Sequence, residues 1–181
     1  EPAPAAAFGE ARERSRGYEV LDGIAVVPVL GVLVARLGTP YSYGYVTGYD
    51  GIRQNVADAL ADPDVKAIAL QVDSPGGEVR GLFDLVDALH AARGEKPLRS
   101  IILGSAYSAA YALASAADRV LVPRTGGTGS IGVIALHVDF SRMLDEAGIT
   151  VTLLFHGARK ADGNPYQPLA DAARARFQRS I

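Results

Sequence analysis

Serine, lysine and backbone amides are the groups in this sequence that could together cleave an acyl bond. Three serines lie in the small and apolar stretch G-S-A-Y-S-A-A-Y-A-L-A-S-A-A-D-R-V (104–120), at Ser105, Ser108 and Ser115. One interpretation is a small-residue helix that packs closely against its neighbours. The other is a serine nucleophile at the start of a buried helix. The stretch by itself does not decide between them.

The segment D-S-P-G-G-E-V (73–79) lies where a strand is expected to end and a helix to begin. Gly76 and Gly77 allow the backbone to turn sharply and to expose its N–H groups. In an acyl-transfer enzyme, amides near a helix start can form an oxyanion hole. An ordinary strand–helix turn has the same composition, so the motif alone leaves both interpretations open.

Lys160 is the candidate base, in the loop segment F-H-G-A-R-K-A-D-G-N-P (155–165). A lysine can replace histidine as the general base if its amine is neutral, although most lysines in loops are simply solvated. The three histidines, at 90, 137 and 156, have no metal-ligand spacing and do not indicate a Ser-His-Asp triad.

A glycine-rich loop, T-G-G-T-G-S-I-G-V (125–133), fits the dinucleotide pattern G-x-G-x-x-G. That pattern requires a helix to follow it, whereas I-G-V-I-A-L-H-V-D (131–139) is typical of a strand. We therefore reject a dinucleotide site, and we expect no cofactor and no metal.

The elements that must position these residues alternate along the chain. Strands are expected within 19–35 and at 65–73, 99–104, 119–123, 131–139 and 150–155. Helices are expected at about 50–62 and 79–92, in the alanine-rich stretch, near 140–147, and in the tail from Pro168. The segment 37–49, rich in Gly and Tyr, predicts an irregular loop that could contact a partner. The alternation predicts an α/β fold of βαβ units around a largely parallel sheet.

Composition limits the remaining possibilities. The 181 residues, 49% hydrophobic and 21% charged, suit a single domain at 19–181 after a flexible N-terminal lead-in at 1–18. The formal net charge of −2 gives no basic footprint, so we expect no nucleic-acid partner. Cysteine is absent, which excludes disulfides and a cysteine nucleophile. The longest apolar run, 24–35, is too short to span a membrane.

Four motifs in order carry a family resemblance: S-P-G-G after a strand, A-Y-S-A-A-Y opening a helix, T-G-S-I-G-V, and G-x-x-K. This order resembles the Ser–Lys serine peptidases of the signal peptide peptidase A family. Within that family the sequence is most similar to the capsid-assembly proteases of lambda-like tailed phages (the protein C group), over about residues 24–181. The resemblance implies a Clp-protease/crotonase-like α/β fold and a serine endopeptidase.

The family motifs imply a role for five residues. Ser108 would be the nucleophile and Lys160 the general base, with Ser130 orienting the lysine. The backbone N–H groups of Gly77 and Ala109 would form the oxyanion hole. Ser105 and Ser115 are out of register with the motif. Relatives often have glycine where this sequence has Ala109-Ala110.

The resemblance also implies a biological setting. Its substrates would be proteins or peptides, namely phage scaffold or portal proteins and the enzyme itself, cut during capsid maturation. We expect a homo-oligomer in the host cytoplasm or the prohead interior, with no membrane span. The alternatives are a bacterial peptidase of the same family that degrades signal peptides, and a non-catalytic capsid-assembly module. A crotonase-type acyl-CoA enzyme remains a distant third, because no sequence feature indicates CoA binding.

Overall fold

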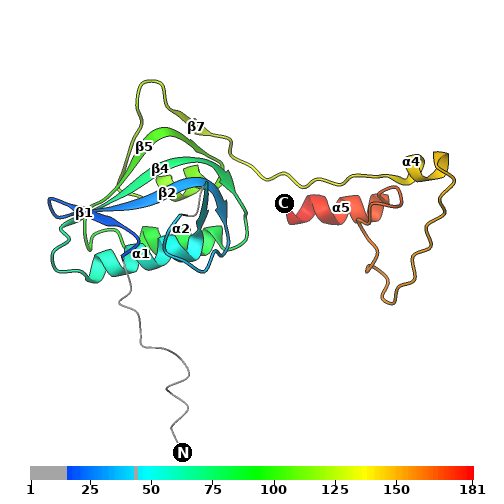
Figure 1. Ribbon diagram of the computed structural model, residues 1–181, viewed down its shortest axis with the longest axis horizontal. Coiled ribbons are helices and arrows are strands. Elements are labelled where there is room, and N and C mark those ends of the chain that lie inside the picture. The colour runs from blue at the N-terminus through cyan, green and yellow to red at the C-terminus, as the bar shows by residue number, and fades with distance from the viewer. Residues whose placement is uncertain (1–15, 43–44) are drawn as a thin grey trace, which may run out of the picture. The chain divides into compact units, whose positions relative to one another are not determined.

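The computed structural model describes residues 16–42 and 45–181 (Figure 1). Contacts divide the chain into two units, one ending at Ile131 and the other running from Gly132 to Ile181. The first contains β1 (Glu19–Leu21), β2 (Ile24–Val34), β3 (Val46–Gly48), α1 (Tyr49–Ala61), β4 (Ala67–Gly77), α2 (Leu82–Ala91), β5 (Leu98–Tyr107), α3 (Ala109–Ser115), β6 (Arg119–Leu121) and β7 (Gly127–Gly129). The second contains α4 (Ser141–Glu146) and α5 (Asp171–Ser180). No helix in the described part of the chain is long and apolar enough to cross a membrane.

A seven-stranded sheet forms the centre of the first unit. Its strand order is β1-β2-β4-β5-β6, with β3 beside β2 and β7 beside β5. Strands β2, β4, β5 and β6 run parallel, whereas β1 pairs antiparallel with β2. Helices α1, α2 and α3 connect the successive parallel strands. The expected α/β fold of βαβ units is therefore confirmed.

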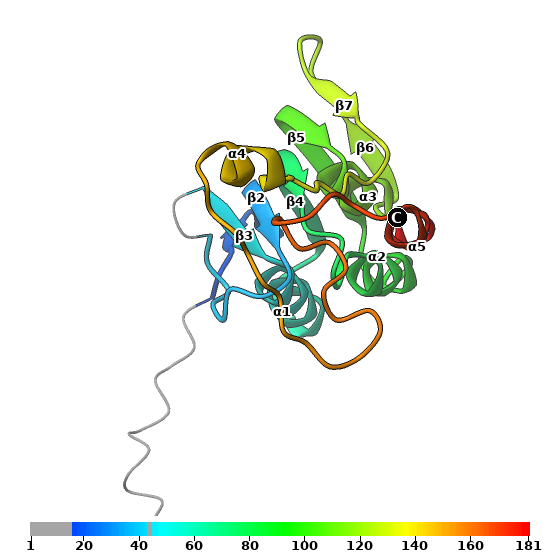
Figure 2. The ribbon, with the colours of Figure 1, turned by 90° about the vertical axis from the view of Figure 1, so that its right-hand side faces the viewer.

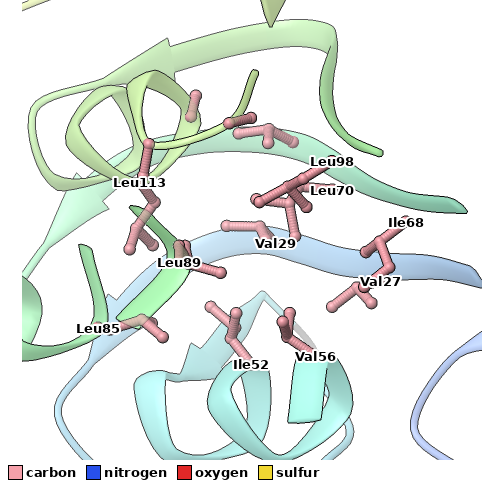
Figure 3. Close-up of a cluster of buried hydrophobic side chains, with 14 of the residues drawn as sticks. Val27, Val29, Ile52, Val56, Ile68, Leu70, Leu85, Leu89, Leu98 and Leu113 are labelled. Carbon is pink, nitrogen blue, oxygen red and sulfur yellow. The ribbon is translucent and has the colours of Figure 1, made fainter. Parts of the chain in front are cut away.

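Helices α1 and α2 lie on the same side of the sheet (Figure 1 and Figure 2). Figure 3 shows buried side chains of the core between these layers. Along β2, buried residues alternate with more exposed ones, so every second side chain enters this core. The labelled core residues are Val27 and Val29 of β2, Ile68 and Leu70 of β4, Leu98 of β5, Ile52 and Val56 of α1, Leu85 and Leu89 of α2, and Leu113 of α3. Burial of each such side chain stabilises the fold by about 1.5–3 kcal/mol.

Helix α3 packs closely because its residues are small. Ala109, Ala110 and Ala114 are at most 3% exposed. The buried Ser100 of β5 donates its hydroxyl hydrogen to the carbonyl of Ala114, at 3.0 Å. The alanines thus have the packing role that the sequence suggested for them.

In the second unit the two expected helices are confirmed, but the two expected strands are wrong. Neither 131–139 nor 150–155 forms a strand, although both ranges are apolar. A strand requires its backbone N–H and C=O groups to pair with a neighbouring strand. Apolar alternation shows only that a segment could enter a sheet, and the described residues of the second unit contain no sheet.

The Gly- and Tyr-rich segment 37–49 is not wholly irregular. Its last residues form β3, which runs parallel to β2, and Tyr49 begins α1. Residues 43 and 44 lie outside the described residues, as do residues 1–15 of the expected lead-in. Tyr18, the last residue of that lead-in, is 7% exposed.

Candidate active site

Ser108 lies at the point where the chain changes from β5 to α3. Its backbone has φ 51° and ψ −122°, a combination that non-glycine residues rarely adopt. Its N–H donates to the carbonyl of Gly129 at 2.7 Å, and its own carbonyl accepts the N–H of Ala112 at 3.1 Å. Both the N–H and the C=O of Ser108 are therefore held by backbone hydrogen bonds. A strained strand–helix turn of this kind presents the nucleophilic serine in other hydrolases.

The Gly76–Gly77 turn lies directly against Ser108. A Cβ on Gly76 would stand 2.8 Å from the Cβ of Ser108, 2.8 Å from the carbonyl oxygen of Tyr107 and 3.1 Å from the backbone nitrogen of Ala109. Gly76 also has φ 103°, so both its conformation and its surroundings require glycine. The structure thus brings the S-P-G-G turn together with the candidate nucleophile and the amide that follows it.

Ser74 supports this turn from inside the protein, and its role was not predicted. Its side chain is fully buried, and its hydroxyl oxygen accepts the N–H of Gly76 at 3.0 Å. Serine commonly makes such a bond two residues along the chain at a turn. The position of the serine within S-P-G-G is the signal that could have indicated this role.

An irregularity in β5 lies just before the candidate nucleophile. Val72 pairs with Ile102 but Ser74 pairs with Ala106, so β5 has extra residues opposite Asp73. The Asp73 carboxylate accepts the N–H of Ser105 at 2.9 Å and its hydroxyl at 3.0 Å. Such bulges redirect a strand beside functional sites. Ser105 therefore has a structural partner.

Ser115 has a local partner as well. Its hydroxyl donates to the carbonyl of Ala112, one turn earlier in α3, at 2.8 Å. The residue lies at the far end of the helix from Ser108. This placement agrees with the position of Ser115 outside the register of the family motif.

Ser130 immediately follows β7, whose last residue, Gly129, accepts the Ser108 amide. Ser130 is exposed and has φ 54°. In the described part of the chain, the non-glycine residues with positive φ are Asp22, Ser108 and Ser130. Two of these three are predicted site residues, and backbone strain of this kind concentrates at functional sites.

Lys160 lies in a turn of the second unit. Its side chain is exposed, and its N–H donates to the carbonyl of Gly157 at 3.1 Å. Asn164 closes the same loop, because its side-chain amide donates to the carbonyl of Ala161 at 2.8 Å and its carbonyl oxygen lies 3.0 Å from Nε2 of His137. Lys160 belongs to the second unit and Ser108 to the first, so the dyad remains a prediction.

Family comparisons agree with the fold and with the motifs. The family model described as peptidase family S49 matches residues 90–181, which include Ser108, Ser130 and Lys160. The model described as Clp protease matches residues 52–125, from α1 to the segment beyond β6. This match agrees with the Clp-protease/crotonase-like fold that the resemblance implies. The chain belongs to peptidase family S49.

Two similar relatives are phage proteins. The chain is 43% identical to the head-tail preconnector protein GP5 of Enterobacteria phage P21, over 92% of this chain and 33% of the relative. It is 42% identical to the capsid assembly protease C of Escherichia phage lambda, over 91% of this chain and 38% of the relative. The chain therefore spans 33% of the length of one relative and 38% of the other.

More distant similarities extend to bacterial proteins. Protease 4 of Salmonella typhi is 33% identical over 82% of this chain and 22% of its own length. Among solved structures, an enoyl-CoA hydratase/isomerase family protein from Hyphomonas neptunium is 18% identical, with a TM-score of 0.45. That match covers 75% of this chain and 52% of the other.

Proposed function

We propose that this chain is the peptidase domain of a serine endopeptidase in which Ser108 is the nucleophile and Lys160 the general base. The observation that carries the proposal is the strained strand–helix turn at Ser108, packed against the backbone of Gly76. Membership of peptidase family S49 supports the reaction class.

In the proposed mechanism, the neutral amine of Lys160 accepts the hydroxyl proton of Ser108 while the serine oxygen attacks the peptide carbonyl. The backbone N–H groups of Gly77 and Ala109 bind the resulting oxyanion, and one such donor contributes roughly 2.7–4 kcal/mol of transition-state stabilisation. Lys160 then protonates the departing amine as the C–N bond breaks. A water molecule, deprotonated by the same amine, hydrolyses the acyl-enzyme. Ser130 holds the amine in position through a hydrogen bond.

The proposed substrates are structural proteins of a phage particle. The two phage relatives are named for capsid assembly and for head–tail connection, and both are more similar to this chain than the bacterial Protease 4 is. We therefore propose that the enzyme cuts scaffold or portal proteins, and itself, in the host cytoplasm or the prohead interior. We also propose that it acts as a homo-oligomer, which analytical ultracentrifugation tests; a fully active monomer would exclude it.

The decisive experiment compares Ser108→Ala, Lys160→Ala and the control Ser115→Ala. Labelling with a fluorophosphonate probe and cleavage of scaffold protein are measured for each. We expect the Ser108 variant to lose both signals and the Ser115 variant to keep both. Labelling of Ser108→Ala at the wild-type level would show that Ser108 is not the nucleophile. A wild-type protein that neither labels nor cleaves would instead be a non-catalytic assembly module.

A further inference from the structure

Tyr49 does not belong to an exposed tyrosine surface, although it lies at the end of the tyrosine-rich segment. It is the first residue of α1 and is only 3% exposed. Its hydroxyl donates to the carbonyl oxygen of Glu78 at 2.6 Å. Glu78 is the residue directly after Gly77, so a buried side chain from a distant helix reaches the proposed oxyanion turn.

Three hydrogen bonds hold Glu78 in place. Besides the bond from Tyr49, its N–H donates to the carbonyl of Leu33 in β2 at 2.9 Å. Its carboxylate accepts the N–H of Ala35 at 2.8 Å. Two of these bonds attach Glu78 to β2 and its end, and the third attaches it to α1.

The turn before Glu78 is closely packed on both of its faces. A Cβ on Gly77 would overlap the carbonyl oxygen of Leu33, at 1.8 Å, so the Gly77 backbone is pressed against β2. On the other side, Gly76 contacts Ser108, and the Gly76 N–H is held by Ser74. A small displacement of Glu78 is therefore transmitted to the amide of Gly77.

We infer that Tyr49 is a positioning residue for the proposed oxyanion hole, because its hydroxyl fixes Glu78 and thereby sets the location of the amide of Gly77, the residue between Glu78 and Gly76. This inference rests on the proposed function. Oxyanion donors act through preorganised geometry, and a displacement of about 1 Å can lower a rate by about a hundredfold.

The protonation state of Tyr49 suits this role. Burial, assisted by the negative charge of Glu78, raises the pKa of the Tyr49 hydroxyl to about 12. The hydroxyl therefore keeps its proton at any pH at which the enzyme is assayed. The hydrogen bond from Tyr49 to the Glu78 carbonyl therefore does not change over the ordinary range of assay pH.

The test is Tyr49→Phe in the full chain, which removes one oxygen atom and leaves the buried ring in place. We expect kcat to fall by between about tenfold and about a hundredfold, with KM changed by less than about twofold. A peptidyl boronic acid, which forms a tetrahedral anion on the nucleophile, should bind more weakly by a similar factor. A peptide amide of the same sequence forms no tetrahedral anion, so it should bind to the variant with the same affinity as to the wild type.

Tyr18→Phe is the matched control. Tyr18 is also buried, at 7% exposed, and its hydroxyl interacts with Asp62 beyond the end of α1. This variant also removes the hydroxyl of a buried tyrosine, but next to Asp62 at the opposite end of α1 from Tyr49. We expect its kcat and boronate affinity to equal those of the wild type, even if its melting temperature falls.

Glu78→Ala provides a second variant in case Tyr49→Phe does not fold. The Glu78 side chain is exposed, and its removal releases the bond to Ala35, so kcat should fall in the same manner. Wild-type kcat and boronate affinity in the folded variants would overturn the inference while leaving the proposed function intact. A wild-type protein that is not labelled by fluorophosphonate and does not cleave would overturn both.

Discussion

The backbone of Gly76 packs against the side chain of Ser108. A Cβ atom added to Gly76 would lie only 2.8 Å from the Cβ of Ser108. We expect Gly76→Ala to lower kcat/KM by at least about a hundredfold, because the added methyl group must displace Ser108 or the Ala109 amide. The protein should also lose about 1–3 kcal/mol of stability, since φ is 103°. Peptide cleavage and urea denaturation measure the two effects.

Gly94→Ala separates the two effects in Gly76→Ala. Gly94 has φ 91°, but no atom lies within 4 Å of the position that its Cβ would occupy. This variant should lose a comparable amount of stability and keep wild-type kcat/KM. Equal activities in the two variants would show that the contact with Ser108 has no catalytic consequence.

Lys160→Arg should be as inactive as Lys160→Met. The guanidinium stays protonated at any accessible pH, so it cannot accept the serine proton. General-base catalysis typically contributes between about a hundredfold and about ten-thousandfold, and we expect kcat to fall by that amount in both variants. The rate of single-turnover acylation by an activated peptide ester measures this loss. Substantial activity in Lys160→Arg would show that Lys160 provides charge and not base catalysis.

Asp50 should make stability depend on pH in the acid range. Burial raises the pKa of its carboxyl, but backbone hydrogen bonds from Leu37, at 3.0 Å, and Gly38, at 2.9 Å, lower it further than burial raises it. The pKa in the folded state therefore lies below that in the unfolded state. The stabilisation is complete above the unfolded value of about 3.9 and is lost as the pH falls through the folded value.

Asp50→Ala tests this dependence. At pH 7 the variant should be less stable by about 1–3 kcal/mol, and below the folded pKa the difference from wild type should become smaller, because the neutral carboxyl accepts weaker hydrogen bonds. The free energy of unfolding, measured by urea denaturation from pH 2 to pH 7, gives both values. Asp87→Ala, which removes an exposed carboxylate from α2, is the control and should differ little from wild type throughout. A constant difference for Asp50→Ala at every pH would contradict the prediction.

Arg93 should stabilise the helix that begins after Ser108. Its guanidinium donates to the carbonyls of Ser115, Ala116 and Ala117, at 2.6–3.0 Å, at the C-terminal end of α3. Arg93→Met should therefore lower the free energy of unfolding by about 1–3 kcal/mol. Thermal unfolding measures the loss. Arg80→Met, which removes an exposed arginine, is the control for the lost charge. An equal loss of stability in both variants would show that the hydrogen bonds from Arg93 to the end of α3 contribute nothing.

The local pattern of the sequence was sufficient for most elements of the first unit. The apolar runs at 65–73 and 99–104 correspond to β4 and β5, and the helical spacing at 50–62 corresponds to α1. These elements are recognisable because their buried side chains recur with the period of a strand or a helix. The same reasoning was wrong at 131–139 and 150–155, where the apolar residues have no strand partner in the described chain.

Within the site, the motif order by itself indicates Ser108, Ser130, Lys160 and the glycines of S-P-G-G. The supporting residues could not be found in this way. Tyr49 and Glu78 are 29 positions apart, and Asp73 and Ser105 are 32 apart. No local pattern indicates such pairs, because each depends on where two separate elements meet.

The sequence by itself determined the βαβ order, the family motifs and the small residues that let α3 approach the sheet. Only the tertiary structure decided that Gly76 contacts Ser108 and that Tyr49 points inward to Glu78. The physical reason is that periodicity and motifs are properties of neighbouring residues. Contacts between the ends of β4, β5 and α1 arise only when the parallel strands pair and the helices cover them.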